Sequence, residues 1–191
     1  MTESRIRSAR VIAAGSATRI LLTPVVMWLV LYGDGDSAEL AAAILFGVAA
    51  ATDWIDGRLA RRWGVTSKLG SFLDTTADKL LVSGVLIALL EAGRASAWIV
   101  AVIVGRELIV MGLRGVAASE GEVMEPSMLG KVKTSIQFLA IILAILRPGE
   151  EIAGLYLDEW AMLAAAAITV ASAADYLMRV LPVVAREDRQ A

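Results

Sequence analysis

The sequence contains no histidine and no cysteine, and each absence removes a class of chemistry. Without cysteine there are no disulfides and no thiolate nucleophiles, and without both residues the usual ligands of zinc are missing. A Ser-His-Asp triad is excluded for the same reason. Catalysis must therefore use carboxylates, basic side chains, hydroxyl groups or a bound ion, and a hard cation on carboxylate oxygens is the natural remaining choice.

Polar residues are scarce as well. The chain has 191 residues, of which 58% are hydrophobic, and a mean hydropathy of +0.68, whereas a soluble domain is only about half apolar. Its 18 basic and 20 acidic residues nearly balance, so the net charge indicates no nucleic acid or other polyanionic partner. The length permits a single domain over residues 1–191.

Six apolar stretches are each long enough to cross a bilayer, which takes roughly 20 helical residues. They lie near residues 14–32, 38–61, 72–92, 97–118, 127–147 and 159–184. We therefore expect an all-α integral membrane protein with six transmembrane helices. Arg19 interrupts the first stretch and five more follow, which argues against a cleaved signal peptide.

The distribution of basic residues predicts the orientation of these helices, because loops rich in lysine and arginine stay in the cytoplasm. The connections 33–37, 93–96 and 148–158, with their flanks, hold Arg94 and Arg147, and the other basic residues lie on the opposite side or within the spans. Both termini are expected to be cytoplasmic, in a multi-pass protein of a cell membrane such as the bacterial inner membrane. An outer aromatic belt would comprise Trp28, Tyr32, Trp98, Tyr156 and Trp160.

The segment 1–13 has two interpretations. It places Ile6, Val11 and Ile12 among Arg5, Arg7 and Arg10. This pattern is typical of a short interfacial helix lying on the inner leaflet. A disordered basic tail is the alternative.

Four aspartates stand close together in the apolar sequence. Asp53 and Asp56 are three residues apart near the end of the second stretch, and Asp74 and Asp78 are four apart near the start of the third. Such spacings place each pair on one helix face, and the short turn between the stretches makes the two helices antiparallel neighbours. Each charge costs about 2.5–3.5 kcal/mol near the centre of a span, and like charges repel without a cation between them. The pattern predicts a site for one or two divalent ions.

The region reads D-x2-D-G-x2-A-R-x8-G-x3-D-x3-D, whose fixed positions are Asp53, Asp56, Gly57, Ala60, Arg61, Gly70, Asp74 and Asp78. This pattern resembles the motif of the CDP-alcohol phosphotransferases, and the likeness in topology extends over essentially the whole chain. On that resemblance, Asp53, Asp56 and Asp74 bind metal, and Asp78 combines metal binding with the role of general base. Gly57, Ala60, Arg61 and Gly70 line the site for CDP-diacylglycerol.

The resemblance also implies Mg²⁺ or Mn²⁺ as cofactor, with two ions bound, and a homodimer formed through membrane helices. Taken alone, Gly57 would be explained by close packing of membrane helices.

A second group of charges points to the acceptor alcohol. Five basic residues could surround a phosphate with charge-assisted hydrogen bonds: Arg19, Arg106, Arg114, Lys131 and Lys133. The alternative is that they are topology signals on the cytoplasmic side. Gly105-Arg106-Glu107 with Leu113-Arg114, and Gly130-Lys131-Val132-Lys133-Thr134, resemble the phosphatidylglycerophosphate synthase branch of the family.

That branch transfers the phosphatidyl group from CDP-diacylglycerol to sn-glycerol 3-phosphate, giving phosphatidylglycerophosphate and CMP in phospholipid biosynthesis. Phosphatidylinositol phosphate synthase and the cardiolipin synthase with this fold are the alternatives within the family. A cation transporter is disfavoured because the aspartates cluster at one end, beside Arg61. An inactive homologue is disfavoured because all four aspartates are present.

Overall fold

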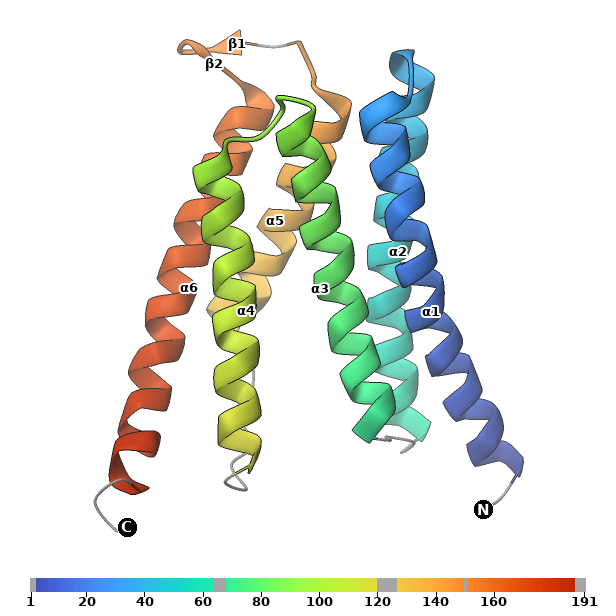
Figure 1. Cartoon of the computed structure of the whole chain (residues 1–191), viewed down its shortest axis with the longest axis vertical. Helices are drawn as coiled ribbons and strands as arrows, with labels where there is room; N and C mark the ends of the chain where they lie inside the picture. The colour runs from blue at the N-terminus through green and yellow to red at the C-terminus, as the bar shows by residue number, and fades with distance from the viewer. Residues whose placement is uncertain (1–2, 64–67, 120–126, 150, 188–191) are drawn as a thin grey trace. The chain divides into compact units, whose positions relative to one another are not determined.

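The computed structural model describes residues 3–63, 68–119, 127–149 and 151–187, with side chains over 15–52, 72–118, 127–149 and 151–180. Helices make up nearly all of this part of the chain (Figure 1): α1 (Glu3–Tyr32), α2 (Gly35–Trp63), α3 (Lys68–Glu91), α4 (Ala97–Ser119), α5 (Met128–Leu146) and α6 (Leu157–Glu187). The expected all-α architecture is confirmed.

Four of these helices are apolar enough to cross a membrane by length and composition: α1 over Gly15–Tyr32, α2 over Gly35–Thr52, α5 over Met128–Leu146 and α6 over Leu157–Val180. The helices α3 and α4 are 24 and 23 residues long, but each carries at least three charged side chains in its interior. These are Asp74, Asp78 and Lys79 in α3, and Arg106, Glu107 and Arg114 in α4. The described part of the chain fits a multi-pass membrane protein.

The N-terminal segment departs from both interpretations of the sequence. The backbone forms one continuous helix from Glu3 to Tyr32, so neither a separate interfacial helix nor a disordered tail precedes the first apolar stretch. Ala13, Ala14 and Ala17 bridge the basic and apolar parts. Alanine has the highest helix propensity, and Gly15 alone does not offset it.

A short hairpin between α5 and α6 was not predicted. Its strands β1 (Glu151–Ile152) and β2 (Leu155–Tyr156) are antiparallel, with Ile152 opposite Leu155. The two turn residues, Ala153 and Gly154, have φ values of 54° and 84°, and a two-residue turn with both φ values positive matches the twist of a hairpin. Trp160 at the start of α6 donates from Nε1 to the carbonyl of Ile152 at 2.9 Å, which ties the hairpin to the helix.

The chain folds as two compact units. Unit 1 comprises residues 1–94 with 144–146, and unit 2 comprises 95–143 with 147–191. In unit 1, α1 packs along both α2 and α3 (Figure 1). Its fully buried side chains include Val26, Phe46, Leu81, Val85 and Leu89. The expectation that residues 1–191 form a single membrane domain stays a prediction.

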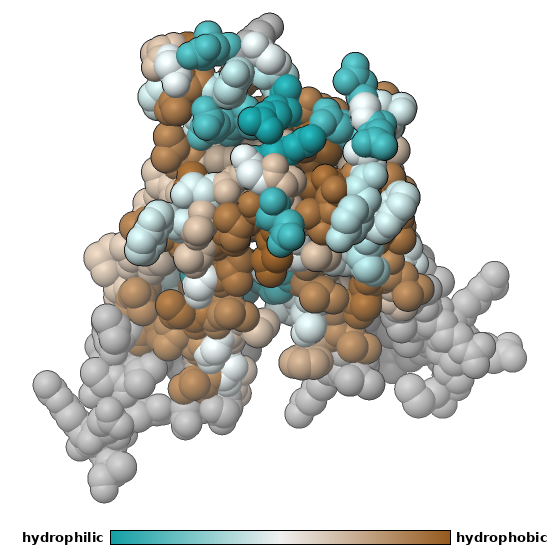
Figure 2. Space-filling model, turned by 45° about the horizontal axis from the view of Figure 1, so that its top comes forward, coloured by the Kyte–Doolittle hydropathy of each residue, from teal (hydrophilic) through white to brown (hydrophobic). Residues whose placement is uncertain are grey.

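In unit 2, α4 packs against α6. Val110, Tyr176 and Val180 form a buried apolar cluster, and Leu113 packs against it. The visible flanks of the helices in both units are coloured mainly as hydrophobic (Figure 2). Several large apolar side chains are at least half exposed, as contact with lipid would require. Examples are Ile44 and Ile87 in unit 1 and Ile109 and Val170 in unit 2.

One glycine sets the distance between α1 and α3. A Cβ atom at Gly84 would lie 2.8 Å from Cγ2 of Thr23 and 3.1 Å from Sδ of Met27. Thr23 cannot turn away freely, because it is β-branched and its hydroxyl donates to the carbonyl of Arg19 at 2.8 Å. The absence of a side chain at Gly84 therefore allows the two helices to meet closely.

Replacing Gly84 with alanine should lower the free energy of unfolding by about 1–2 kcal/mol, because overpacking at this contact outweighs the gain in helix propensity. Thermal unfolding of the purified protein in detergent measures the effect. Gly47→Ala in α2 is the matched control, since a Cβ atom there meets nothing within 4 Å, and it should be neutral or slightly stabilising. Equal shifts for the two variants would contradict the close approach at Gly84.

Candidate active site

The first part of the aspartate motif lies on α2. Asp53, Asp56, Gly57, Ala60 and Arg61 all belong to this continuous helix, and Gly70 belongs to the first turn of α3. The helical spacing assumed for Asp53 and Asp56 is thus correct. The side chains of these six residues, and residues 64–67, lie outside the described part of the chain, so the roles predicted for these six residues stay predictions.

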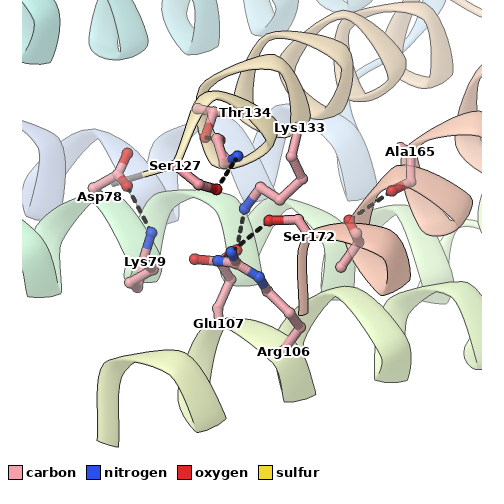
Figure 3. A network of polar contacts seen from close by, with 11 residues as sticks. Asp78, Lys79, Arg106, Glu107, Ser127, Lys133, Thr134, Ala165 and Ser172 are labelled. Carbon is pink, nitrogen blue, oxygen red and sulfur yellow. Dashed lines mark hydrogen bonds and ion pairs between the residues drawn. The ribbon is translucent and has the colours of Figure 1, made fainter. Parts of the chain in front are cut away.

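The second part of the motif lies on α3, where Asp74 and Asp78 stand one turn apart. Oδ1 of Asp74 accepts from Nη2 of Arg19 at 2.7 Å and from Oγ of Ser16 at 3.3 Å. Oδ2 of Asp78 pairs with Nζ of Lys79 at 3.2 Å (Figure 3). The two aspartate side chains are 32% and 20% exposed, so both remain accessible from outside the helix pair.

Arg19 occupies an unexpected place. It was predicted to bind the acceptor phosphate, but its side chain is completely buried in unit 1 and its guanidinium lies against Asp74. A charged residue in the middle of an apolar helix is tolerated when it is paired and hydrogen-bonded. The structure therefore groups Arg19 with a predicted metal ligand, a pairing across 55 residues that no sequence pattern indicated.

A second polar cluster forms inside unit 2, where α4, α5 and α6 meet (Figure 3). Nζ of Lys133 on α5 donates to Oε1 of Glu107 on α4 in a short contact. Arg106 donates from Nη1 to the same oxygen at 3.3 Å and from Nη2 to Oγ of Ser172 on α6 at 2.8 Å. The side chains of Lys133 and Glu107 are 3% and 2% exposed, and that of Arg106 is 13% exposed.

The remaining two basic residues of the predicted phosphate site have different surroundings. Lys131 and Arg114 are exposed. The guanidinium carbon of Arg114 lies 5.8 Å from the centre of the Tyr176 ring, a distance typical of a cation–π contact. The five predicted residues thus divide into a buried pair on Glu107, two exposed side chains in unit 2, and Arg19 in unit 1.

Three buried polar residues of the same helices, Ser16, Gln137 and Ser172, were not predicted from the sequence. Ser16 and Ser172 are small hydroxyl residues in apolar helices, and their spacing carries no signal of a partner. Gln137 stands one turn after Lys133 on α5 and is 2% exposed. Its Nε2 has no hydrogen-bond partner among the described residues. Its position four residues after Lys133, inside an apolar span, was the signal that could have found it.

The donor chemistry of α3 fits a divalent metal ion. Magnesium and manganese prefer carboxylate oxygens. Each of the two α3 aspartates has one oxygen without a hydrogen bond in the described part of the chain, Oδ2 in Asp74 and Oδ1 in Asp78. Two carboxylates do not make a complete metal site, and no group of three or more candidate ligands occurs among the described side chains. Asp53 and Asp56 are the predicted additional ligands.

Comparison with known proteins agrees with the sequence motif. A protein-family model described as CDP-alcohol phosphatidyltransferase matches residues 14–176. A CDP-diacylglycerol–glycerol-3-phosphate 3-phosphatidyltransferase of Escherichia coli (strain K12) is 38% identical over 166 residues, which cover 83% of this chain and 88% of that one. The protein of the same name from Sodalis glossinidius is 39% identical over 145 residues, covering 73% of this chain and 78% of the relative.

A third relative of that name, from Bacillus subtilis (strain 168), is 52% identical over 104 residues. That match spans about half of each protein, 54% of this chain and 54% of the relative. The family match covers most of the chain and includes every position of the aspartate motif. The chain belongs to the CDP-alcohol phosphatidyltransferase family.

The contact between Arg19 and Asp74 yields a prediction about stability. Arg19→Gln should lower the free energy of unfolding by about 2 kcal/mol, less than is typical of a fully buried pair because Asp74 is partly exposed. Lys79→Gln is the matched control, because it removes an ion pair to Asp78 from a side chain that is 28% exposed. Chemical unfolding in detergent should show the larger loss for Arg19, and equal losses would count against a structural role for its pairing.

Proposed function

We propose that this chain transfers the phosphatidyl group of CDP-diacylglycerol to sn-glycerol 3-phosphate, giving phosphatidylglycerophosphate and CMP. The observation that carries the proposal is the likeness to the Escherichia coli relative named for this reaction, which extends over 83% of this chain and 88% of that protein. The reaction supplies a phospholipid precursor, so both the donor and the product reside in the membrane.

The reaction is a substitution at phosphorus. The hydroxyl oxygen of the acceptor attacks the phosphorus that bears diacylglycerol, and the bond from that phosphorus to the bridging oxygen of CMP breaks. CMP leaves with that oxygen, and the acceptor's proton passes to a carboxylate. We assign this proton to Asp78, because it stands one turn after Asp74, the other proposed metal ligand on α3, and its side chain remains partly exposed.

The cofactor in this proposal is Mg²⁺ or Mn²⁺, as two ions held by Asp53, Asp56, Asp74 and Asp78. When bound, such ions would neutralise the diphosphate of the donor and the charge that develops on CMP. Arg19 holds Asp74 in one orientation through Oδ1. Gly57, Ala60, Arg61 and Gly70 would line the site for the cytidine diphosphate group.

The phosphate of the acceptor is assigned to basic residues of unit 2. Arg106 and Lys133 are the strongest candidates, because both are largely buried and both are directed to one point by Glu107. Arg114 and Lys131 would contribute from the surface. In this proposal Arg19 contributes by orienting Asp74, and it does not contact the phosphate directly.

The proposal includes six transmembrane helices, with α3 and α4 as the two charged spans. Their charged side chains would lie toward the protein and the site, and both termini and the site would face the cytoplasm. Aromatic side chains at the opposite helix ends, Trp28, Tyr32, Trp98 and Trp160, are 44% exposed or more, as residues of a membrane–water interface are. A homodimer in a bacterial inner or plasma membrane is the expected assembly.

Metal dependence is the first test. CMP release by the purified protein should stop in EDTA and return on addition of Mg²⁺ or Mn²⁺. Asp53→Asn, Asp56→Asn and Asp74→Asn should each reduce turnover by several orders of magnitude, because each removes a charged ligand from a shared site. Glu39→Asn serves as control. It alters a carboxylate that is outside the motif and that pairs with Arg94 at 2.6 Å. Full activity in EDTA would disprove the metal mechanism.

The acceptor is the second test. CMP release from CDP-diacylglycerol should be supported by glycerol 3-phosphate and not by glycerol, because an uncharged alcohol cannot form charge-assisted hydrogen bonds with the basic side chains. Arg106→Gln and Lys133→Gln should raise the KM for glycerol 3-phosphate about tenfold or more, and Lys131→Gln should raise it less. Preference for inositol phosphate or for phosphatidylglycerol would instead identify one of the other activities within the family.

A further inference from the structure

The polar cluster in unit 2 converges on a single oxygen atom. Oε1 of Glu107 accepts from Nζ of Lys133 and from Nη1 of Arg106, so one carboxylate oxygen lies between two cations that come from different helices (Figure 3). The carboxylate is 2% exposed. Glu107 is thus shielded from water. Its contacts with the two cations are stronger there than they would be in water.

Glu107 offsets the repulsion between the two cations. The cluster brings two cations, Arg106 and Lys133, together around one carboxylate, Glu107. Two cations brought together without an anion would repel each other, and burying them would be costly. Glu107 therefore makes their proximity possible.

The geometry of Arg106 shows that its guanidinium is held from two sides. Arg106 and Glu107 are neighbours on α4, and consecutive side chains on a helix point about 100° apart. The guanidinium nevertheless reaches Glu107 at 3.3 Å through Nη1, while Nη2 donates to Ser172 of α6 at 2.8 Å. These two contacts fix the plane of the guanidinium, which determines the direction of its remaining donors.

We propose that Glu107 is the positioning residue of the acceptor site: it holds Lys133 and Arg106 in the arrangement that binds the phosphate of the acceptor. The inference rests on the proposed function and adds a specificity-determining residue to it. Glu107 acts through the two cations and does not touch the substrate. Because the cations are already ordered, phosphate binding does not have to fix their side chains, and affinity for the acceptor rises.

A purely structural ion pair is the competing explanation, and the two differ in their kinetic consequences. Loss of a structural pair lowers the amount or the stability of folded protein and leaves the kinetic constants of the folded fraction unchanged. Loss of a positioning residue changes the KM for the acceptor alone, because the cations remain present but are no longer directed to the phosphate. Donor binding belongs to a different set of residues and should not respond.

The experiment is steady-state kinetics on the purified full chain, following CMP release. Glycerol 3-phosphate is varied at saturating CDP-diacylglycerol, and CDP-diacylglycerol at saturating glycerol 3-phosphate. Glu107→Gln should raise the KM for glycerol 3-phosphate about tenfold or more, as expected for loss of charge-assisted hydrogen bonds. The kcat should change by less than about threefold, and the KM for CDP-diacylglycerol should remain that of the wild type. Glu107→Asp, which keeps the charge, should recover part of the loss.

Glu39→Gln provides the matched control, because Glu39 also accepts from an arginine, Arg94, at 2.6 Å, but in unit 1. It should leave both KM values unchanged. A Glu107→Gln enzyme with a lowered melting temperature and a wild-type KM for glycerol 3-phosphate would overturn the inference, as would equal rises in both KM values. If Glu107→Gln does not fold, Glu107→Asp decides, since its shorter side chain should still raise the KM for glycerol 3-phosphate selectively. A wild-type enzyme inactive with glycerol 3-phosphate would refute the proposed function itself.

Discussion

The cost of burying charge in an apolar helix is the constraint on which the rest of the structure depends. Arg19 is fully buried and Lys133 nearly so, and each lies directly against a carboxylate supplied by another helix. The pairs Arg19–Asp74 and Lys133–Glu107 thereby join α1 to α3 and α4 to α5 with contacts that lipid cannot replace. The two helices too charged to count as ordinary spans, α3 and α4, are also those that carry the carboxylates of both pairs. The polar residues that weaken these helices as membrane spans include those to which the proposed function assigns roles.

Most of the fold could be predicted from the sequence, because bilayer thickness imposes a length on apolar helices. The predicted spans near 72–92 and 97–118 correspond to α3 over Lys68–Glu91 and α4 over Ala97–Ser119. The placement of the aspartate motif on two helices could be predicted as well, since residues three or four apart on a continuous helix must lie near each other. Helix length and helical spacing are both local properties of the sequence, and they do not depend on how the helices pack.

The failures arose where the outcome depended on weaker or longer-range effects. The continuous helix α1 follows from the high helix propensity of the alanines at 13, 14 and 17, whereas the basic residues around them indicate a separate interfacial segment. The hairpin depends on positive φ at Ala153, a residue that gives no turn signal of its own beside Gly154. The partners of Arg19 and Lys133 are 55 and 26 residues away. A list of basic residues contains nothing that assigns a given carboxylate to a given cation.

Burial separates basic residues that the sequence could only group together. A lysine that marks the cytoplasmic side of a membrane protein needs to be near the headgroups, and exposure serves it best. Lys131 is exposed, as such a lysine should be. Lys133, two residues further along α5, is only 3% exposed and therefore almost completely desolvated. A positive charge that serves topology alone has no reason to bear that desolvation cost, even when one carboxylate partly offsets it. Arg106 is in the same position, shared between Glu107 and Ser172. Under the proposed function, the phosphate of the acceptor would supply oxygen acceptors for both buried side chains, which a role in topology alone does not require.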